Sequence, residues 1–308
     1  MKEFIVSGGD FLRSSGFLSR IQLDEFSGEM RIASEEWISH PVESMAVLGK
    51  GFTGMCLQEK SAMVSFSNII LQIDLESYEI LDQWADSEFN DIHQLHLRDE
   101  LLYIANTGNE SIDVLNIYDH SMKRIDFLGS NLREKRPKSN QDEDTKPHLH
   151  HISGVTINSE GELLVGLVRQ SRILNLENWN WIGPRFTGPV HDVSTDDVGT
   201  IWCTTVPGEV HRFSTDGEHR VWKLSEYQEL VGWTRGLAIT NDGILVGTTA
   251  IRESNSDYFS TFTEQRVGKI PACLTWIPFD DTRSPSTLNL TNPFSRKIFS
   301  IEQIPNQR

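Results

Sequence analysis

The sequence predicts an all-β protein, a single closed β-propeller of six blades, with five or seven blades as the alternatives. Three observations predict it: a repeat of about forty residues, four short strand-like runs in each repeat, and almost no helical periodicity. A lone four-stranded sheet of this size cannot bury both of its faces, so it must stack between neighbours. We therefore expect residues 1–308 to form one domain.

The repeat is clearest where a short apolar strand, a glycine turn and a second strand follow one another. Clear copies begin at Ser153, His191 and Arg235, and their turn glycines are 38 and 44 residues apart. Weaker copies begin at Thr53 and His93. Each copy continues into two more strand-like runs, which is the pattern of propeller blades.

The two ends of the chain are predicted to close the ring together. The N-terminal runs at 3–8, 17–23 and 29–34 supply only three strands, and the run 296–304 can complete that blade. Closure removes the exposed sheet edges that an open arrangement would leave. The predicted blades cover about 3–34, 52–87, 92–128, 149–184, 190–224 and 234–303.

Two segments interrupt the repeat. Residues 129–147 are polar and charged without periodicity, which predicts an exposed loop. Residues 250–269 form a long connection within the last blade, and such loops often act as lids. Its aromatic residues, among them Tyr258, either cover a ligand or pack on the rim, and we favour rim packing.

The composition limits the classes of binding partner and the cellular compartment that we expect. With a formal net charge of −16, the chain repels phosphate backbones and anionic lipid surfaces, so we expect neither nucleic acid nor a membrane as partner. Small neutral or cationic ligands, or a bound cation, fit this charge better. No apolar run is long enough to cross a membrane and no secretory signal is recognisable, which predicts a cytoplasmic protein of unspecified oligomeric state.

The cysteines and tryptophans are predicted to be core residues. The three cysteines are far apart and lie in apolar or β-branched segments, so we expect buried free thiols. Five tryptophans fall on predicted strands and are expected between blades: Trp179, Trp181, Trp202, Trp222 and Trp276.

One position is equivalent in all the repeats, just before the innermost strand of each blade. It is occupied by Thr53, His93, Ser153, His191 and Arg235. In a propeller such positions converge at one mouth of the central channel. Thr53 and Ser153 are therefore candidate substrate-binding residues.

A third histidine lies close to this position. His151 is two residues before Ser153, and a bulge in that blade would bring His151 or His150 level with His93 and His191. Three imidazoles from separate blades make a reasonable site for a divalent transition metal, zinc first. The alternative is that they are channel histidines hydrogen-bonded to backbone or water, without an ion.

A resemblance to known propellers supports these predictions. The segment Tyr103-IANTGNESIDVLNI resembles the NHL repeat, and the apolar segments with glycine turns look like gluconolactonase-like and virginiamycin-lyase-like propellers. The amidating lyase of the NHL-like group holds zinc with histidines at the starts of inner strands. That resemblance implies His93, His151 and His191 as ligands. Asn106, in the NTGN turn, serves the turn or contacts the ligand.

Two charged residues complete the candidate site. Arg235 is suited to holding a carboxylate or stabilising an oxyanion, and Asp192 to orienting an imidazole or acting as a base. The alternatives are an ion pair for Arg235 and a capping role for Asp192.

Two functions follow from these residues. The first is a metal-dependent lyase or hydrolase that acts on a small polar molecule at the channel mouth, and we favour it because of the histidines and Arg235. The second is a non-catalytic scaffold that binds a protein or a glycan through its rim loops. Fold alone does not separate them.

Overall fold

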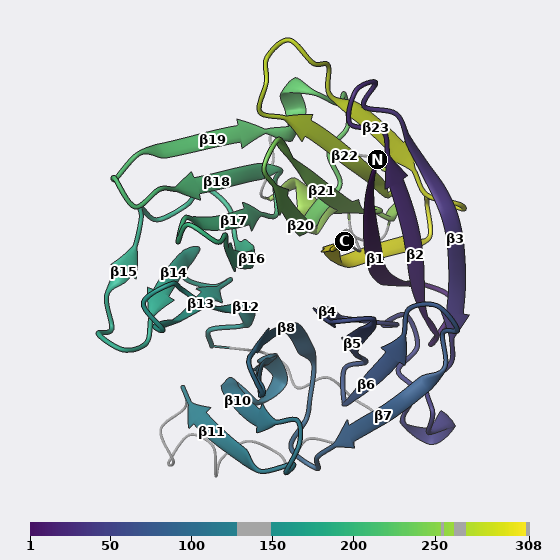
Figure 1. Cartoon of the computed structure of the whole chain (residues 1–308), viewed down its shortest axis with the longest axis vertical. Helices are drawn as coiled ribbons and strands as arrows, with labels where there is room; N and C mark the ends of the chain where they lie inside the picture. Colours follow the sequence, from purple (N-terminus) through teal and green to yellow (C-terminus); the bar gives the residue numbers. More distant parts are fainter. Residues whose placement is uncertain (128–148, 254–255, 262–268, 306–308) are drawn as a thin grey trace.

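The chain forms a ring of six four-stranded antiparallel sheets, which confirms the predicted six-bladed β-propeller (Figure 1). The computed structural model describes residues 1–127, 149–253, 256–261 and 269–305. Each sheet is one blade, and one edge strand of each sheet, which we call its inner strand, lies closest to the central channel.

In every blade the strands are ordered from the channel outward. The first three blades are β24 (Arg296–Ile304), β1 (Lys2–Asp10), β2 (Gly16–Leu23) and β3 (Met30–Ile38); β4 (Gly54–Gln58), β5 (Ser61–Ser65), β6 (Ile69–Asp74) and β7 (Ile80–Ala85); and β8 (Ile92–Arg98), β9 (Leu101–Asn106), β10 (Ser111–Asn116) and β11 (Met122–Asp126). The last three are β12 (Ile152–Ile157), β13 (Leu163–Leu167), β14 (Arg172–Asn175) and β15 (Trp181–Ile182); β16 (Val190–Thr195), β17 (Ile201–Thr205), β18 (Glu209–Phe213) and β19 (His219–Lys223); and β20 (Trp233–Thr240), β21 (Gly243–Thr249), β22 (Cys273–Pro278) and β23 (Ser286–Asn289).

The C-terminal strand closes the ring, as predicted. β24 pairs antiparallel with β1 from Glu3↔Ile304 to Asp10↔Arg296, so the two ends of the chain share one blade. The sixth blade therefore ends with β23, and residues 296–304 belong to the first blade.

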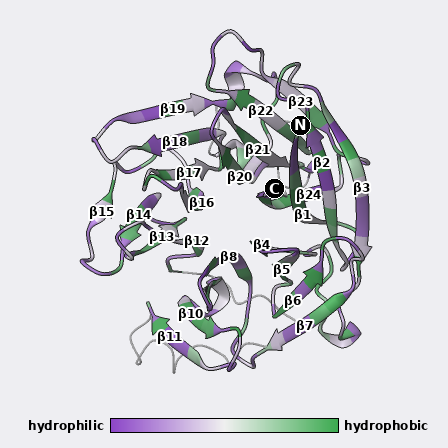
Figure 2. Cartoon of the chain, viewed as in Figure 1, coloured by the Kyte–Doolittle hydropathy of each residue, from purple (hydrophilic) through white to green (hydrophobic). Residues whose placement is uncertain are grey.

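Apolar side chains fill the spaces between neighbouring blades. Between the first two blades, Ile5 and Leu18 pack with Met55 and Val64, and all four are at most 1% exposed. Strands of every blade carry hydrophobic stretches around the ring (Figure 2). Stacking is thus how each sheet buries the faces that it cannot cover alone.

Three of the five tryptophans predicted to lie in the core do so. Trp202, Trp222 and Trp276 are buried between blades. The prediction was wrong for Trp179 and Trp181, which are 63% and 43% exposed. Both lie on or beside β15, the two-residue outermost strand of its blade, which no further strand of the described chain covers.

The remaining fold predictions have mixed outcomes. The three cysteines are buried free thiols, as predicted. Segment 250–269 does connect two strands of the last blade, β21 and β22, and includes the short helix α2 (Ser256–Ser260). The polar segment 129–147 lies outside the described residues. Among the described helices, none has the length and apolar character that crossing a membrane requires.

Ring closure predicts a large effect of one core side chain on stability. Ile298 of β24 is fully buried in the core between the first and last blades. We expect Ile298→Ala to lower the free energy of unfolding by about 3 kcal/mol, through lost burial and a cavity. Denaturant unfolding followed by circular dichroism measures it. Ile80→Ala, at a 43% exposed strand position, is the control and should cost less than about 1 kcal/mol. Equal losses of unfolding free energy in the two variants would contradict the role of β24 in closing the ring.

Candidate functional site

Five of the six innermost strands carry a β-bulge at the same level of the channel. One extra residue interrupts the register of each with its neighbour, and among the described inner strands β4 alone pairs without a shift. A bulge re-aims the side chains beside it. The bulged positions are Phe299 of β24, His93 and Gln94 of β8, Ser153 of β12, His191 and Asp192 of β16, and Arg235 and Gly236 of β20.

Three histidines from three blades come together at this level, two of them at bulges. The ring centroid of His93 lies 4.9 Å from that of His151 and 5.7 Å from that of His191. His150 instead contacts Phe127, with ring centroids 5.8 Å apart, so His151 is the residue that joins the group. We call His93, His151 and His191 the histidine cluster. It lies where the inner strands start.

A carboxylate of the neighbouring blade holds His151 in place. The side chain of Glu110 accepts hydrogen bonds from the backbone N–H groups of His150 and His151, at 2.8 and 2.9 Å. His151 has a φ of 54°, in the left-handed region that non-glycine residues rarely adopt. Glu110 thus stabilises the conformation that presents His151 to the cluster.

Burial keeps His93 neutral although an acid lies beside it. Burial lowers the pKa of His93 to about 4, against the raising effect of Asp91, whose Oδ1 lies 3.3 Å from His93 Nε2. Asp91 also pairs with Lys50 at 2.6 Å. Burial alone would raise the pKa of Asp91, but Lys50 and His93 bring it well below its usual value. Asp91 is therefore ionised and His93 uncharged at neutral pH.

Arg235 is a half-buried cation next to His191. Burial lowers the pKa of His191, and the charge of Arg235 lowers it further. The guanidinium of Arg235 lies 4.3 Å from the ring centroid of Phe299 and 5.6 Å from that of Trp233. Burial lowers its own pKa to about 10, so Arg235 remains a cation at neutral pH. Aromatic rings stabilise the guanidinium without neutralising it, so its charge stays available to an anionic ligand.

Asp192 joins two blades rather than acting mainly on an imidazole. Its Oδ2 accepts hydrogen bonds from the Thr204 hydroxyl at 2.6 Å and from the Gly236 N–H at 2.9 Å. Its Oδ1 is 3.7 Å from His191 Nδ1, beyond hydrogen-bond distance. Burial raises the pKa of Asp192, but its contacts with His191, Thr204 and Gly236 lower it overall. The carboxylate therefore holds the bulge that carries Arg235.

The histidine cluster contains buried nitrogen atoms without hydrogen-bond partners. They are Nδ1 of His93 and both ring nitrogens of His191, and the Nε of Arg235 is in the same state. Among the described residues, no three His, Cys, Asp or Glu side chains are arranged to hold a metal ion. The imidazoles of His93 and His191 are thus uncharged donors, but the histidine cluster does not converge on one point.

The four predicted substrate-binding residues lie outside the cluster or have other partners. The Thr53 hydroxyl contacts Ser65 in its own blade, and Ser153 donates to the Val190 carbonyl of the next blade at 2.9 Å. Asn106 donates to Asp113 at 2.7 Å within its turn. Tyr258 lies on α2, and its side chain is outside the described part of the chain. Their proposed contact with a substrate remains a prediction.

Sequence reasoning missed Phe299, Lys50 and Glu110. Phe299 occupies the bulge of β24, in a run whose sequence pattern indicates ring closure and nothing more. Lys50 and Glu110 act from turns, where no repeat position marks them. Alignment of the C-terminal strand with the other inner strands is the signal that could have found Phe299.

The lowered pKa of His93 predicts a loss of stability in acid. The unfolded chain protonates this histidine below about pH 6.5, whereas the folded chain does so only near pH 4. The folded state therefore loses up to about 3 kcal/mol between these values. Unfolding titrations from pH 7 to 4, with a chelator present, should show a weaker pH dependence in His93→Gln. The exposed His120→Gln is the control and should match the unchanged chain, while an unaltered dependence in His93→Gln would contradict the assignment.

Comparisons with known proteins establish the fold. No model of a known protein family matches the chain, and no curated protein does. Among solved structures, a nidogen/laminin complex matches with a TM-score of 0.63 and 8% identity over 100% of this chain and 99% of that one. A candidate 6-phosphogluconolactonase from Bacteroides fragilis matches with a TM-score of 0.53 and 12% identity, over 99% of this chain and 98% of that one. A streptogramin B lyase matches with a TM-score of 0.50 and 12% identity, over 79% of this chain and 70% of that one. At these identities the likeness shows a six-bladed β-propeller, a fold that both enzymes and binding proteins share.

Proposed function

We propose that the chain is an enzyme, a lyase or a hydrolase, that acts on a small polar molecule at the histidine cluster. The supporting observation is the set of buried imidazole nitrogens without partners in the described structure. Each such group costs about 1–3 kcal/mol when nothing satisfies it. Their retention beside the cationic Arg235 is typical of a site that a bound molecule completes.

The residues suit proton transfer next to an anion. A neutral imidazole both accepts and donates a proton, and within the described structure both ring nitrogens of His191 lack a hydrogen-bond partner. Arg235 supplies a fixed positive charge beside His191, which suits a substrate carboxylate or a developing oxyanion. Asp192 is a positioning residue, because it holds the N–H of Gly236 directly after Arg235.

The zinc site predicted from the sequence remains part of the proposal. Uncharged imidazoles are the form that binds zinc, and His93, His151 and His191 would hold it. The rings of the described residues are not arranged around an ion, so binding requires them to rotate. A bound ion would supply a Lewis acid at this end of the channel.

Substitutions at the cluster test the enzyme proposal. Assays of elimination and hydrolysis with a panel of small lactones, esters and carboxylates should find a substrate of the unchanged protein. We expect His191→Ala and Arg235→Gln each to reduce kcat/KM by at least about 100-fold, as loss of a proton-transfer or oxyanion group does. The exposed His120→Ala is the matched control. Turnover that survives both changes would contradict the proposal.

Metal analysis tests the zinc site separately. The protein loaded with zinc and passed through a desalting column should retain about one ion per chain. His93→Ala and His191→Ala should each weaken zinc binding at least about tenfold, and His120→Ala should not. Substoichiometric zinc under every loading condition would contradict the zinc site. The proposed enzyme would then act through its imidazoles without an ion. A partner captured through the rim loops by all of these variants would instead favour the non-catalytic scaffold.

A further inference from the structure

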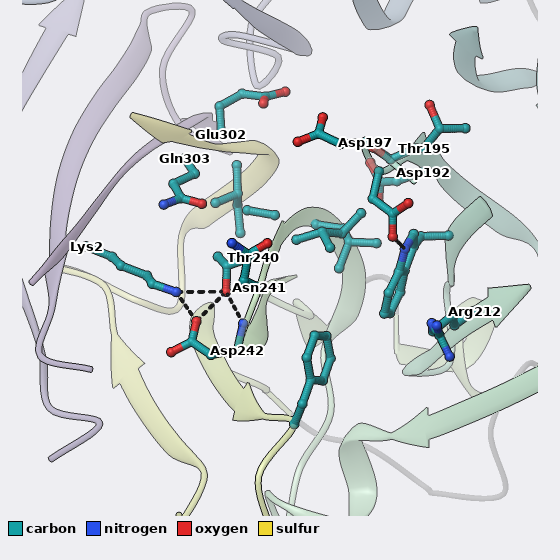
Figure 3. Close-up of a pocket in the computed structure, with 18 of the residues that line it drawn as sticks. Lys2, Asp192, Thr195, Asp197, Arg212, Thr240, Asn241, Asp242, Glu302 and Gln303 are labelled. Carbon is teal, nitrogen blue, oxygen red and sulfur yellow. Dashed lines mark hydrogen bonds and ion pairs between the residues drawn. The ribbon is translucent and has the colours of Figure 1, made fainter. Parts of the chain in front are cut away.

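A cavity of about 1080 Å³ extends from the bulge level, where Gln94 and Asp192 line it, to the ends of the inner strands. Figure 3 shows residues that line it. It is lined by residues at the ends of inner strands, such as Thr195 of β16, Thr240 of β20 and Gln303 of β24. The histidine cluster and Arg235 lie where these strands start, and none of them lines the cavity. We call this cavity the strand-end chamber.

The chamber has an acidic axis. The titratable residues that the inner strands and the turns after them contribute to its lining are all acidic: Asp192, Asp196, Asp197, Asp242 and Glu302, of which the four aspartates carry charge at pH 7. Asp196 accepts from Trp202 Nε1 at 3.0 Å and caps its own turn, whereas Asp197 has no side-chain partner within the described chain. No Lys or Arg of a described inner strand lines the chamber.

The basic residues of the described lining belong to strands further from the axis. Lys2 of β1 pairs with Asp242 and donates to Thr240. Arg212 of β18 pairs with Glu218 at 2.9 Å. Arg220 of β19 lies over the Trp222 ring, 4.5 Å from its centroid. These contacts hold the cations at the periphery, so of the acidic residues only Asp242 is neutralised by one of them.

Unused hydrogen-bonding groups also line the chamber. Ser300 is only 8% exposed, and its hydroxyl has no hydrogen-bond partner in the described part of the protein. Glu302 likewise lacks a partner there, and Figure 3 shows its side chain near that of Asp197. The Ser300 oxygen is open to the chamber, so it can hydrogen-bond a bound molecule in place of water.

The protonation of Glu302 gives the chamber two charge states. Burial raises its pKa to about 8, so the carboxyl is mostly uncharged at pH 7 and can donate a hydrogen bond to a bound molecule. Above pH 8 it becomes a further negative charge. The titratable groups on strands packed against β24 are Lys2, Glu3 and Asp10 of β1, Cys56 of β4 and Arg235 of β20.

We propose that the strand-end chamber binds a small organic cation, an amine that also carries hydrogen-bonding groups. Its acidic axis attracts the positive charge, and Ser300 with the neutral Glu302 hydrogen-bonds the rest of the molecule. A net charge of −16 raises the local concentration of such cations. The chamber reaches the level of the bulges, where Gln94 and Asp192 line it, but neither the histidine cluster nor Arg235 does. This site therefore goes beyond the enzyme proposed above.

Thiol labelling with charged reagents tests the chamber directly. Ser194→Cys places a thiol in the lining, and Thr287→Cys, on the outermost strand of the sixth blade, is the matched exposed control. Each variant reacts with methanethiosulfonates that carry either a trimethylammonium or a sulfonate group. We expect the ratio of the cationic to the anionic rate constant to be roughly tenfold higher at position 194 than at position 287.

Further substitutions in the Ser194→Cys background identify the groups responsible. Asp197→Asn should lower the rate ratio about threefold at pH 7, whereas Glu302→Gln should leave it unchanged. Between pH 7 and 9 the ratio should rise with Glu302 present and stay level with Gln. The ratio cancels the ionisation of the thiol itself.

The outcomes separate this proposal from the histidine site. Equal ratios at positions 194 and 287, or a ratio that Asp197→Asn does not change, would overturn the cation site and leave the activity tests above unaffected. If the thiol at position 194 does not react or that variant does not fold, Ser300→Cys provides a second position in the lining. Failure of both positions to react would show that the chamber does not admit small ions and would equally overturn the proposal.

Discussion

The pairing of β24 with β1 is the contact on which the rest of the structure depends. It joins the two ends of the chain in one blade and so gives every blade two neighbours. Without it, the cores on both sides of the first blade would face water, including the one that contains Ile298. Closure also fixes the channel, because only a complete ring directs all six inner strands toward one axis.

A bulge near the start of most inner strands turns this closed ring into a site. The same irregularity in five blades presents a different side chain each time, from Phe299 to the histidines and Arg235. Because these residues are held by sheet registers, their positions depend on packing rather than on a loop. Burial then keeps His93 and His191 neutral and leaves Arg235 charged.

The two ends of the channel differ in chemistry. The end where strands start gathers neutral imidazoles and a guanidinium, which suit an anionic or polar ligand. The end where strands finish is a chamber with acidic residues on its axis, among them Asp197 and Glu302, which suit a cation. Asp192 lies between them, since it lines the chamber while holding the backbone next to Arg235.

The sequence by itself determined the blades and the closing strand and predicted that His93 and His191 meet, with His150 or His151 as the third imidazole, because a forty-residue repeat places equivalent positions at equivalent points of a ring. A bulge does lie in that blade, at Ser153, and the structure selects His151 over His150. Only the tertiary structure decided the exposure of Trp179 and Trp181, the roles of Lys50, Glu110 and Phe299, and the strand-end chamber. The physical reason is that burial and pairing depend on which neighbour a residue meets across blades, and a repeat pattern within one chain records positions but not those contacts.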